Sequence, residues 1–366
     1  MNIPKINHNQ LHQILNTSYE NRLPVFIHGT FGIGKSFTVK EWAKAKAKEM
    51  NLLYSENVQD INSEKHFMCL VIPLHQYDSA EVKGIPVKSA DGKSTEFLPT
   101  SLLPRIGSGI LFFDELNLAP PMIQANAYQL IHDRRLGNYV LPDGYVSYGA
   151  GNTDSDMAHT FSMANPLKNR FGHAELTVPT VDRWVKDFAI QHNIDNREIA
   201  FLSSREQYLF SYDADSTNEQ TAIASPRTWE MLSKAISKLE NDSPLLETFV
   251  GMFVGTGIAR EFMAHIKLIQ SYDIASIMKG KEFKVPKEID SIYAFISGVV
   301  SYYIKNVEKD MAKRFHEVLS TLPKEYAMMG MYLVVKQDKD FFKKMKTVLS
   351  KAEMDKLAQQ IIQIST

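Results

Sequence analysis

The sequence predicts an α/β protein in which a doubly wound parallel sheet is followed by a mainly helical part. In the first half, short continuous apolar runs alternate with helix-like segments, a pattern typical of parallel strands that are covered on both faces. From about Asp182 onward, strand-like runs become rare and apolar residues recur at helical spacing. The chain of 366 residues is 44% hydrophobic and 23% charged, so it can bury the cores of two or three packed units.

Five apolar runs are the candidate strands of this sheet. They are Pro24–His28, His66–Pro73, Gly109–Asp114, Tyr145–Gly149 and Ala174–Val178. The segment Ser36–Met50 is rich in Ala, Lys and Glu and predicts a helix soon after the first strand. In the second half, helical spacing is clearest in Thr228–Leu239, Leu245–Ile269 and Ala312–Leu322. The proline in Thr177–Thr180 disfavours a continuing helix, so we expect a linker between the two halves there.

A glycine-rich loop links the first predicted strand to its helix. Gly29–Ser36 fits the phosphate-binding pattern G-x-x-x-x-G-K-[ST], in which glycines let backbone N–H groups surround an anion. Lys35 can reach the β- and γ-phosphates, Ser36 can place its hydroxyl on Mg²⁺, and the helix start favours phosphate. The residues expected to bind nucleotide are Gly29, Thr30, Phe31, Gly32, Ile33, Gly34, Lys35, Ser36 and Phe37.

Two adjacent acids, Asp114 and Glu115, end the third predicted strand at the carboxyl edge where open α/β sheets bind ligands. Asp114 is expected to hold Mg²⁺ together with Ser36. Glu115 is expected to orient and deprotonate the water that attacks the γ-phosphate. An acid pair at a strand end is common by itself. An acid pair that follows a phosphate loop by roughly 80 residues indicates nucleotide hydrolysis. The sequence has no N-K-x-D motif that reads guanine, which favours ATP.

With both motifs in place, the chain resembles the AAA+ ATPases, and within them the MoxR-like branch of the dynein-related type. Asp114–Pro121 is similar to the "DE-x-N-x-A" segments of that branch, and a helix with Gln124, Asn126, Leu130 and Ile131 follows it. The resemblance covers about residues 11–236 and implies a P-loop NTPase sheet followed by an α-helical lid and a helical C-terminal extension. We expect the nucleotide-binding domain at 1–178, the lid with its sensor 2 at 179–305 and the extension at 306–366.

The resemblance also gives Asn152 a role. Tyr145–Asn152 resembles the sensor 1 strand of the family, whose terminal asparagine helps Glu115 to place the attacking water. The alternative is a plain turn residue after glycine.

Two arginines match family motifs as well. Arg170, in Asn165–Phe171, resembles the arginine finger, which enters the neighbouring subunit's site and stabilises charge on the transferring phosphoryl group. Arg227 follows Ser225, a good helix cap, and Pro226, and resembles sensor 2, which touches the γ-phosphate from the lid. For both arginines the alternative is a surface ion pair. Arg134 and Arg135 are weaker candidates for a contact between subunits.

The resemblance implies an ATP-hydrolysing enzyme with Mg²⁺ as its cofactor. Because the finger acts on a neighbour, it also implies a homo-oligomeric ring, a hexamer by resemblance. Members of this branch often remodel or activate a protein partner, commonly one with a von Willebrand factor A domain. The implied function is therefore that of a chaperone or remodelling ATPase.

Two other classes of function remain open. One is a nucleic-acid-dependent motor, such as a restriction-type translocase subunit, although the net charge of −1 and the lack of a basic and aromatic stripe argue against nucleic acid. The other is a binding module in which ATP locks an assembly, against which Glu115 and Arg170 argue.

The segment Gln76–Leu98 contains a hairpin turn at Ala90–Lys93, and it resembles a family insert that points to the pore or a partner. An ordinary surface hairpin is the alternative.

Composition excludes several further features. The single cysteine, Cys69, cannot form an intrachain disulfide and is expected in the core. Met1–Asn7 lacks the apolar core of a signal peptide, and no window approaches the roughly 18 apolar residues of a membrane span. We therefore expect a cytoplasmic protein without membrane contact. The eleven histidines show no metal-ligand spacing.

Overall fold

The computed structural model describes residues 3–153, 161, 163–212, 222–306, 309–346, 349 and 354. The chain divides into two compact units, Met1–Val178 and Pro179–Thr366. The division falls inside the segment Thr177–Thr180, which carries the proline noted above.

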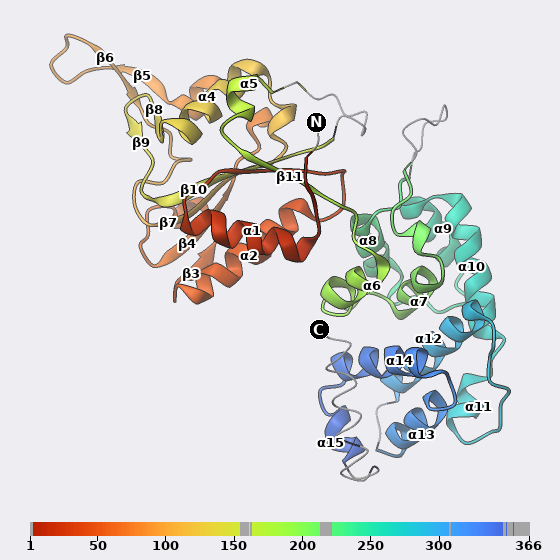
Figure 1. Ribbon diagram of the computed structural model, residues 1–366. Helices are drawn as coiled ribbons and strands as arrows, with labels where there is room; N and C mark the ends of the chain where they lie inside the picture. Colours follow the sequence, from red (N-terminus) through yellow and green to blue (C-terminus); the bar gives the residue numbers. More distant parts are fainter. Residues whose placement is uncertain are drawn as a thin grey trace. The chain divides into compact units, whose positions relative to one another are not determined.

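A sheet of seven parallel strands forms the centre of the first unit (Figure 1). The strands are β1 (Lys5–Ile6), β2 (Val25–His28), β3 (Leu53–Ser55), β4 (His66–Val71), β7 (Ser108–Phe113), β10 (Gly144–Gly151) and β11 (Gly172–Leu176). Their order in space is β1-β11-β2-β10-β7-β4-β3, and each neighbouring pair is parallel. The predicted fold class, a doubly wound parallel sheet followed by a helical part, is confirmed.

Helices cover both faces of this sheet (Figure 1). They are α1 (His8–Glu20), α2 (Lys35–Glu49), α3 (Ser79–Lys83), α4 (Pro121–His132) and α5 (Asn165–Lys168). On one face, Trp42 of α2 lies against Phe67 and Tyr148, with ring centroids 6.2 and 5.7 Å away. On the other face, Leu130 of α4 shares a core with strand residues such as Leu111. Both faces of the central strands are therefore apolar, which explains why their sequences are continuous apolar runs.

All five predicted strands are present, and none of their ends differs from the prediction by more than two residues. Two further strands, β1 and β3, were not predicted. They have only two and three residues and form the two edges of the sheet, so they carry no continuous apolar run. Cys69 is fully buried in β4, as expected.

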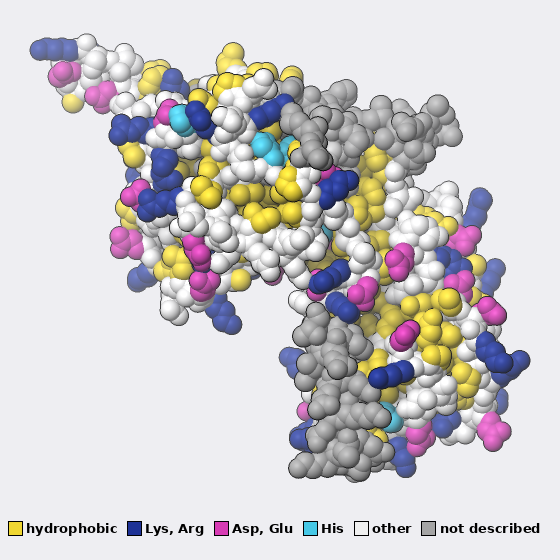
Figure 2. All heavy atoms as spheres, viewed as in Figure 1, with side chains coloured by type: hydrophobic (Ala, Val, Ile, Leu, Met, Phe, Trp, Pro, Cys, Tyr) yellow, Lys and Arg dark blue, Asp and Glu magenta, His cyan; other side chains and the backbone are white. Residues whose placement is uncertain are grey.

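Two hairpins extend from the first unit. β5 (Ile85–Lys88) and β6 (Thr95–Leu98) pair antiparallel, which confirms the predicted hairpin, and Gly92 in its turn has a φ of 68°. The second hairpin joins β8 (Arg135–Leu136) to β9 (Tyr139–Val140). Figure 2 shows basic and acidic side chains near the tip of the first hairpin and hydrophobic side chains nearer its base.

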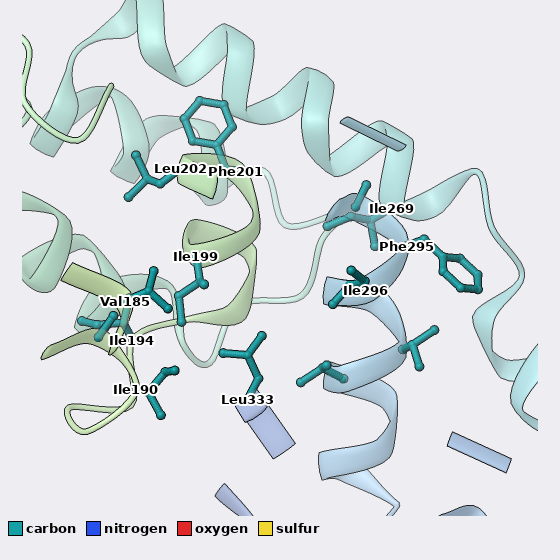
Figure 3. Packing of buried hydrophobic residues seen from close by; sticks show 14 of the residues in the cluster. Val185, Ile190, Ile194, Ile199, Phe201, Leu202, Ile269, Phe295, Ile296 and Leu333 are labelled. Atoms are coloured by element: carbon teal, nitrogen blue, oxygen red, sulfur yellow. The ribbon is translucent and has the colours of Figure 1, made fainter. Parts of the chain in front are cut away.

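Helices make up most of the described part of the second unit, which also contains an isolated antiparallel bridge between Ser211 and Ala224. Its helices are α6 (Val181–Trp184), α7 (Asn196–Ser204), α8 (Pro226–Ile236), α9 (Leu245–Val254), α10 (Thr256–Gln270), α11 (Ile274–Met278), α12 (Ile289–Lys305), α13 (Lys309–Leu319), α14 (Lys324–Gln337) and α15 (Phe341–Met345). A π-helical turn at Val185–Ala189 continues α6. One hydrophobic cluster runs through the unit, and Figure 3 shows Ile199, Phe295 and Leu333 among its members.

The segment Leu245–Ile269 forms two helices rather than one continuous helix. The break is at Gly255, whose φ of 97° is a conformation that favours glycine and ends α9. The predicted division of the helical part at residue 305 stays a proposal. In the part of the chain that the structure describes, no helix is long and apolar enough to cross a membrane.

Candidate functional site

The glycine-rich loop lies between β2 and α2, at the carboxyl edge of the sheet. Gly34 has a φ of 95° and directly precedes the first residue of α2, so glycine is favoured at this position. At Gly29 a Cβ atom would lie 2.9 Å from the Leu176 carbonyl oxygen and 3.0 Å from Ile33 Cδ1. These glycines allow the backbone to fold tightly at the start of α2, where the first amides of a helix have no partner inside the helix.

The ammonium group of Lys35 contacts three oxygen atoms of residues that the structure describes. Its Nζ donates to the carbonyl oxygens of Gly29 at 2.6 Å and Thr30 at 2.8 Å, and to Asn152 Oδ1 at 3.0 Å. The side chain is buried, with 8% of the residue exposed. Lys35 and Asn152 are 117 residues apart in the sequence, and the adjacency of β2 and β10 brings them together.

Ser36 contacts the first of the two acids. Its hydroxyl donates to Asp114 Oδ2 at 2.6 Å. Asp114 follows the last residue of β7, a strand that lies between β10 and β4. The two predicted metal-binding residues are therefore neighbours, with their oxygen atoms in direct contact.

Glu115 has an unusual backbone conformation. Its φ and ψ are 52° and 40°, in the left-handed region that few residues with a side chain adopt. The strand ends two residues earlier and a 3₁₀ turn, Leu116–Leu118, begins directly after it. Strained backbone of this kind often accompanies functional sites, and here it turns the chain sharply at the second acid.

Asn117 is the asparagine of the "DE-x-N-x-A" segment, and the sequence predicted no role for it at the site. Its Nδ2 donates to the backbone carbonyl of Asn152 at 2.9 Å. Its Oδ1 is buried and has no hydrogen-bond partner among the described residues. A Cβ atom on Gly151 would lie 2.4 Å from this oxygen, so glycine at 151 leaves room for the asparagine. Asn117 therefore holds the end of β10, where Asn152 begins its contact with Lys35.

His8 is a second residue that sequence reasoning missed. Its Nε2 lies 2.8 Å from the carbonyl oxygen of Ile33 in the glycine loop. A carbonyl oxygen only accepts, so this ring nitrogen carries the hydrogen. No spacing or motif marks a histidine at the first position of a helix as a partner of a loop that follows it by 25 residues.

Arg170 does not join the groups around Lys35 in its own chain. Its guanidinium lies 5.8 Å from the ring centroid of Tyr128, and its Nη2 is 3.2 Å from His132 Nε2. Both partners belong to α4. Within the described ranges, no hydrogen bond or ion pair connects Arg170 to Lys35, Ser36 or Asp114.

The two weaker arginine candidates differ from each other. Arg134 donates to the carbonyl oxygens of Tyr145 at 3.0 Å and Pro142 at 2.7 Å, so it stabilises its own chain. Arg135 is exposed on β8.

Arg227 belongs to the second unit. Ser225 is the N-cap of α8 and forms a capping box with Thr228, and Pro226 occupies the first turn. Arg227 follows directly and is exposed. The cap places its side chain at the start of the helix. A contact with the nucleotide stays a proposal.

The loop and its neighbours fit a magnesium nucleotide. Thr30 Oγ1 is buried without a hydrogen-bond partner among the described residues, and the Lys35 ammonium group contacts the backbone carbonyl of the same residue. Ser36 and Asp114 offer two oxygen atoms, and Mg²⁺ typically takes only one or two protein ligands together with phosphates and water. In the described part of the chain, no group of three or more His, Cys, Asp or Glu residues forms a cluster that holds a metal by itself.

Comparisons with known proteins identify neither a family nor a relative in sequence. No family model matches the chain, and no curated protein matches it. Among solved structures, NtrX from Brucella abortus in complex with ATP is similar with 13% identity and a TM-score of 0.37, over 100% of this chain and 70% of that one. The RuvB Holliday junction branch migration motor of Thermotoga maritima is similar with 14% identity and a TM-score of 0.27, over 83% of this chain and 77% of that one. Hsp104 with ATPγS and casein is similar with 13% identity and a TM-score of 0.33, over 71% of this chain and 46% of that one.

Proposed function

We propose that this protein is an ATPase that hydrolyses ATP with Mg²⁺ at the loop Gly29–Phe37. The observation that carries the proposal is the convergence of three strand ends on the loop. Lys35 contacts Asn152 after β10, and Ser36 contacts Asp114 after β7, while the loop itself follows β2. Parallel strands end at one edge of a sheet, which is where open α/β sheets bind ligands.

Each of these groups has a distinct role in the proposed reaction. Lys35 and the loop amides bind the phosphates. Ser36 and Asp114 hold Mg²⁺, which when bound neutralises charge on the phosphate oxygens. Glu115 takes a proton from the attacking water, and Asn152 positions that water.

We further propose that the site is completed by a neighbouring copy of the chain in a homo-oligomeric ring, a hexamer in the MoxR-like arrangement. The contacts of Arg170 support this. Its side chain lies on Tyr128 and His132 of α4 and makes no described contact with its own Lys35 or Asp114. An arginine that acts on phosphate across an interface supplies fixed positive charge to the transition state. Arg227 is proposed to contact the γ-phosphate from the helical lid.

The output of the ring is proposed to be the remodelling of a protein partner, with a von Willebrand factor A domain protein as the first candidate. The β5–β6 hairpin is the proposed contact surface. Ile85 and Leu98 pair across its base and are 63% and 59% exposed. Apolar side chains that stay exposed on a projecting hairpin are typical of a surface that meets another protein.

The central test replaces Glu115 with Gln, which keeps the shape of the side chain and removes the base. We expect phosphate release to fall by about 10²- to 10⁴-fold, because that is the usual contribution of a general base. Binding of a fluorescent ATP analogue should stay within a factor of about two, because Glu115 is not a phosphate ligand in this scheme. Glu64→Gln, at an exposed loop position, is the matched control.

Two results would contradict the proposal. Turnover of Glu115→Gln near that of the wild type would show that Glu115 is not the base. Absence of nucleotide binding to the wild-type protein would refute the ATPase assignment as a whole. Stimulation of hydrolysis by DNA that falls steeply with salt would favour a nucleic-acid motor instead of a protein-remodelling ring.

A further inference from the structure

Two histidines connect the glycine loop to the segment that carries Arg170. His28 is the last residue of β2, directly before Gly29, and His173 lies in the neighbouring strand β11. Their rings approach each other, with His28 Nε2 2.9 Å from His173 Nδ1. The other ring nitrogen of His173, Nε2, lies 2.7 Å from the carbonyl oxygen of Lys168.

The chemistry of these atoms fixes the direction of the hydrogen bonds. The Lys168 carbonyl can only accept, so His173 Nε2 carries a hydrogen and donates it. In neutral His173 the other nitrogen, Nδ1, then has a lone pair. It accepts from Nε2–H of His28, which completes a continuous chain from the loop side to Lys168.

This chain of hydrogen bonds ends on the turn that holds Arg170. Phe171 N–H donates to the same Lys168 carbonyl at 3.2 Å, so the carbonyl accepts from both the backbone and the His173 ring. Gly172 N–H donates to Pro24 O at 3.0 Å, at the start of β2. The turn is therefore held by two contacts, one with Pro24 and one with the His173 ring. The second contact connects the turn through His173 to His28, the residue before the phosphate loop.

We propose that His173 is a positioning residue that sets the place of Arg170 according to the state of the loop, an inference that rests on the proposed ATPase with a shared site. Lys35 Nζ now contacts the carbonyl of Gly29, next to His28. When the Lys35 ammonium group moves to a phosphate, the Gly29 carbonyl loses its hydrogen-bond donor. The resulting shift of the backbone next to His28 is transmitted through the His28–His173 hydrogen bond to the turn at Lys168. Nucleotide bound in one subunit thereby changes the position of Arg170, the residue that this subunit inserts into the site of its neighbour.

The test uses His173→Phe, which keeps an aromatic ring beside Phe26 and Phe171 but removes both hydrogen bonds. We expect turnover to fall about a hundredfold, the scale at which a catalytic group displaced by about 1 Å loses activity. The dissociation constant for a fluorescent ATP analogue should change by less than about twofold, because the loop itself is intact. His173→Gln retains a donor for the Lys168 carbonyl and should recover part of the loss. His12→Phe, on α1, is the control.

Mixing of subunits separates positioning from a loss of folding. His173→Phe subunits have an intact loop but a misplaced Arg170. Lys35→Ala subunits have a correctly placed Arg170 but a loop that no longer binds phosphate. A mixture of the two should therefore regain activity that neither has alone. A mixture of His173→Phe with Arg170→Ala should stay inactive, because both lack a working finger. If His173→Phe does not fold, His28→Phe, which removes the donor at the other end of the pair, takes its place.

The mixtures also distinguish failure of this inference from failure of the shared site. Recovery with Arg170→Ala plus Lys35→Ala, but none with His173→Phe plus Lys35→Ala, overturns the positioning role and leaves the shared site intact. No recovery in either mixture refutes the shared site and this inference with it. Wild-type turnover of His173→Phe alone also overturns the inference.

Discussion

Ser36 and Asp114 stand 78 residues apart in the chain, and the Ser36 hydroxyl donates a hydrogen bond of 2.6 Å to Asp114 Oδ2. Ser36 lies in the first turn of α2, after the phosphate loop, and Asp114 follows the end of β7. The contact places a hydroxyl and a carboxylate oxygen where both can face one cation.

The first prediction concerns this pair. Ser36→Ala removes one of the two proposed protein ligands of Mg²⁺, so the Mg²⁺ concentration for half-maximal ATP hydrolysis should rise by about 10- to 100-fold. The measurement is phosphate release at fixed ATP over a titration of free Mg²⁺. Ser101→Ala, at an exposed position, is the control and should follow the wild-type curve. An unchanged Mg²⁺ dependence in an active Ser36→Ala protein would remove Ser36 from the metal site.

The second prediction separates function from stability at Arg227. The side chain is exposed and makes no hydrogen bond or ion pair with the described residues of its unit, so Arg227→Ala should change the unfolding free energy by less than about 0.5 kcal/mol. Turnover should fall by about 10- to 100-fold, because a charge-assisted contact with phosphate is lost. Urea unfolding and phosphate release measure the two quantities. Lys238→Ala, another exposed cation just after α8, is the control, and normal turnover of Arg227→Ala contradicts the sensor role.

The groups around Lys35 could be predicted because each stands in a short motif at the end of a strand. Asp114 follows an apolar run, and Asn152 follows another, so parallel pairing alone brings them to one edge. The loop needed no tertiary information, because its glycines and lysine are adjacent in sequence.

The supporting residues could not be predicted in the same way. His8, Asn117 and His173 act through contacts with residues 25, 35 and 145 positions away, and no periodicity relates the partners. Strand β1 has two residues and is defined by its pairing with β11, which the sequence does not encode locally. The sequence shows Gly255 only as a glycine within an apolar, helix-like run. The helix ends there because Gly255 adopts a φ of 97°, which the sequence alone does not indicate.

Two titratable side chains are buried in the helical unit with opposite effects on stability. His265 is fully buried, and burial lowers its pKa from 6.5 to about 4. Its contribution to stability is present above pH 6.5 and is lost as the pH falls through the range between 6.5 and 4, because the unfolded chain then binds a proton that the folded chain does not.

Glu198 acts in the reverse direction. It is fully buried on α7, and neither carboxyl oxygen has a hydrogen-bond partner among the described residues. Burial raises its pKa well above 4.5, and the nearby Asp195 adds to this while Arg197 opposes it. Arg197 instead pairs with Asp195 at 2.7 Å. Protonated Glu198 therefore stabilises the fold at low pH, and this contribution declines as the pH rises above 4.5 toward the raised pKa.

The third prediction follows from this decline. Glu198→Gln keeps the neutral shape of the side chain at every pH, so its stability relative to the wild type should increase by about 1.4 kcal/mol per pH unit above 4.5, until the raised pKa is reached. The measurement is the unfolding free energy from urea titrations at several pH values between 4 and 8. His265 contributes equally to both proteins, so the difference between them isolates Glu198. Glu247→Gln, exposed on α9, should show no pH-dependent difference. A difference between Glu198→Gln and the wild type that stays constant with pH would mean that the Glu198 carboxyl is ionised in the fold, with an unrecognised partner for its charge.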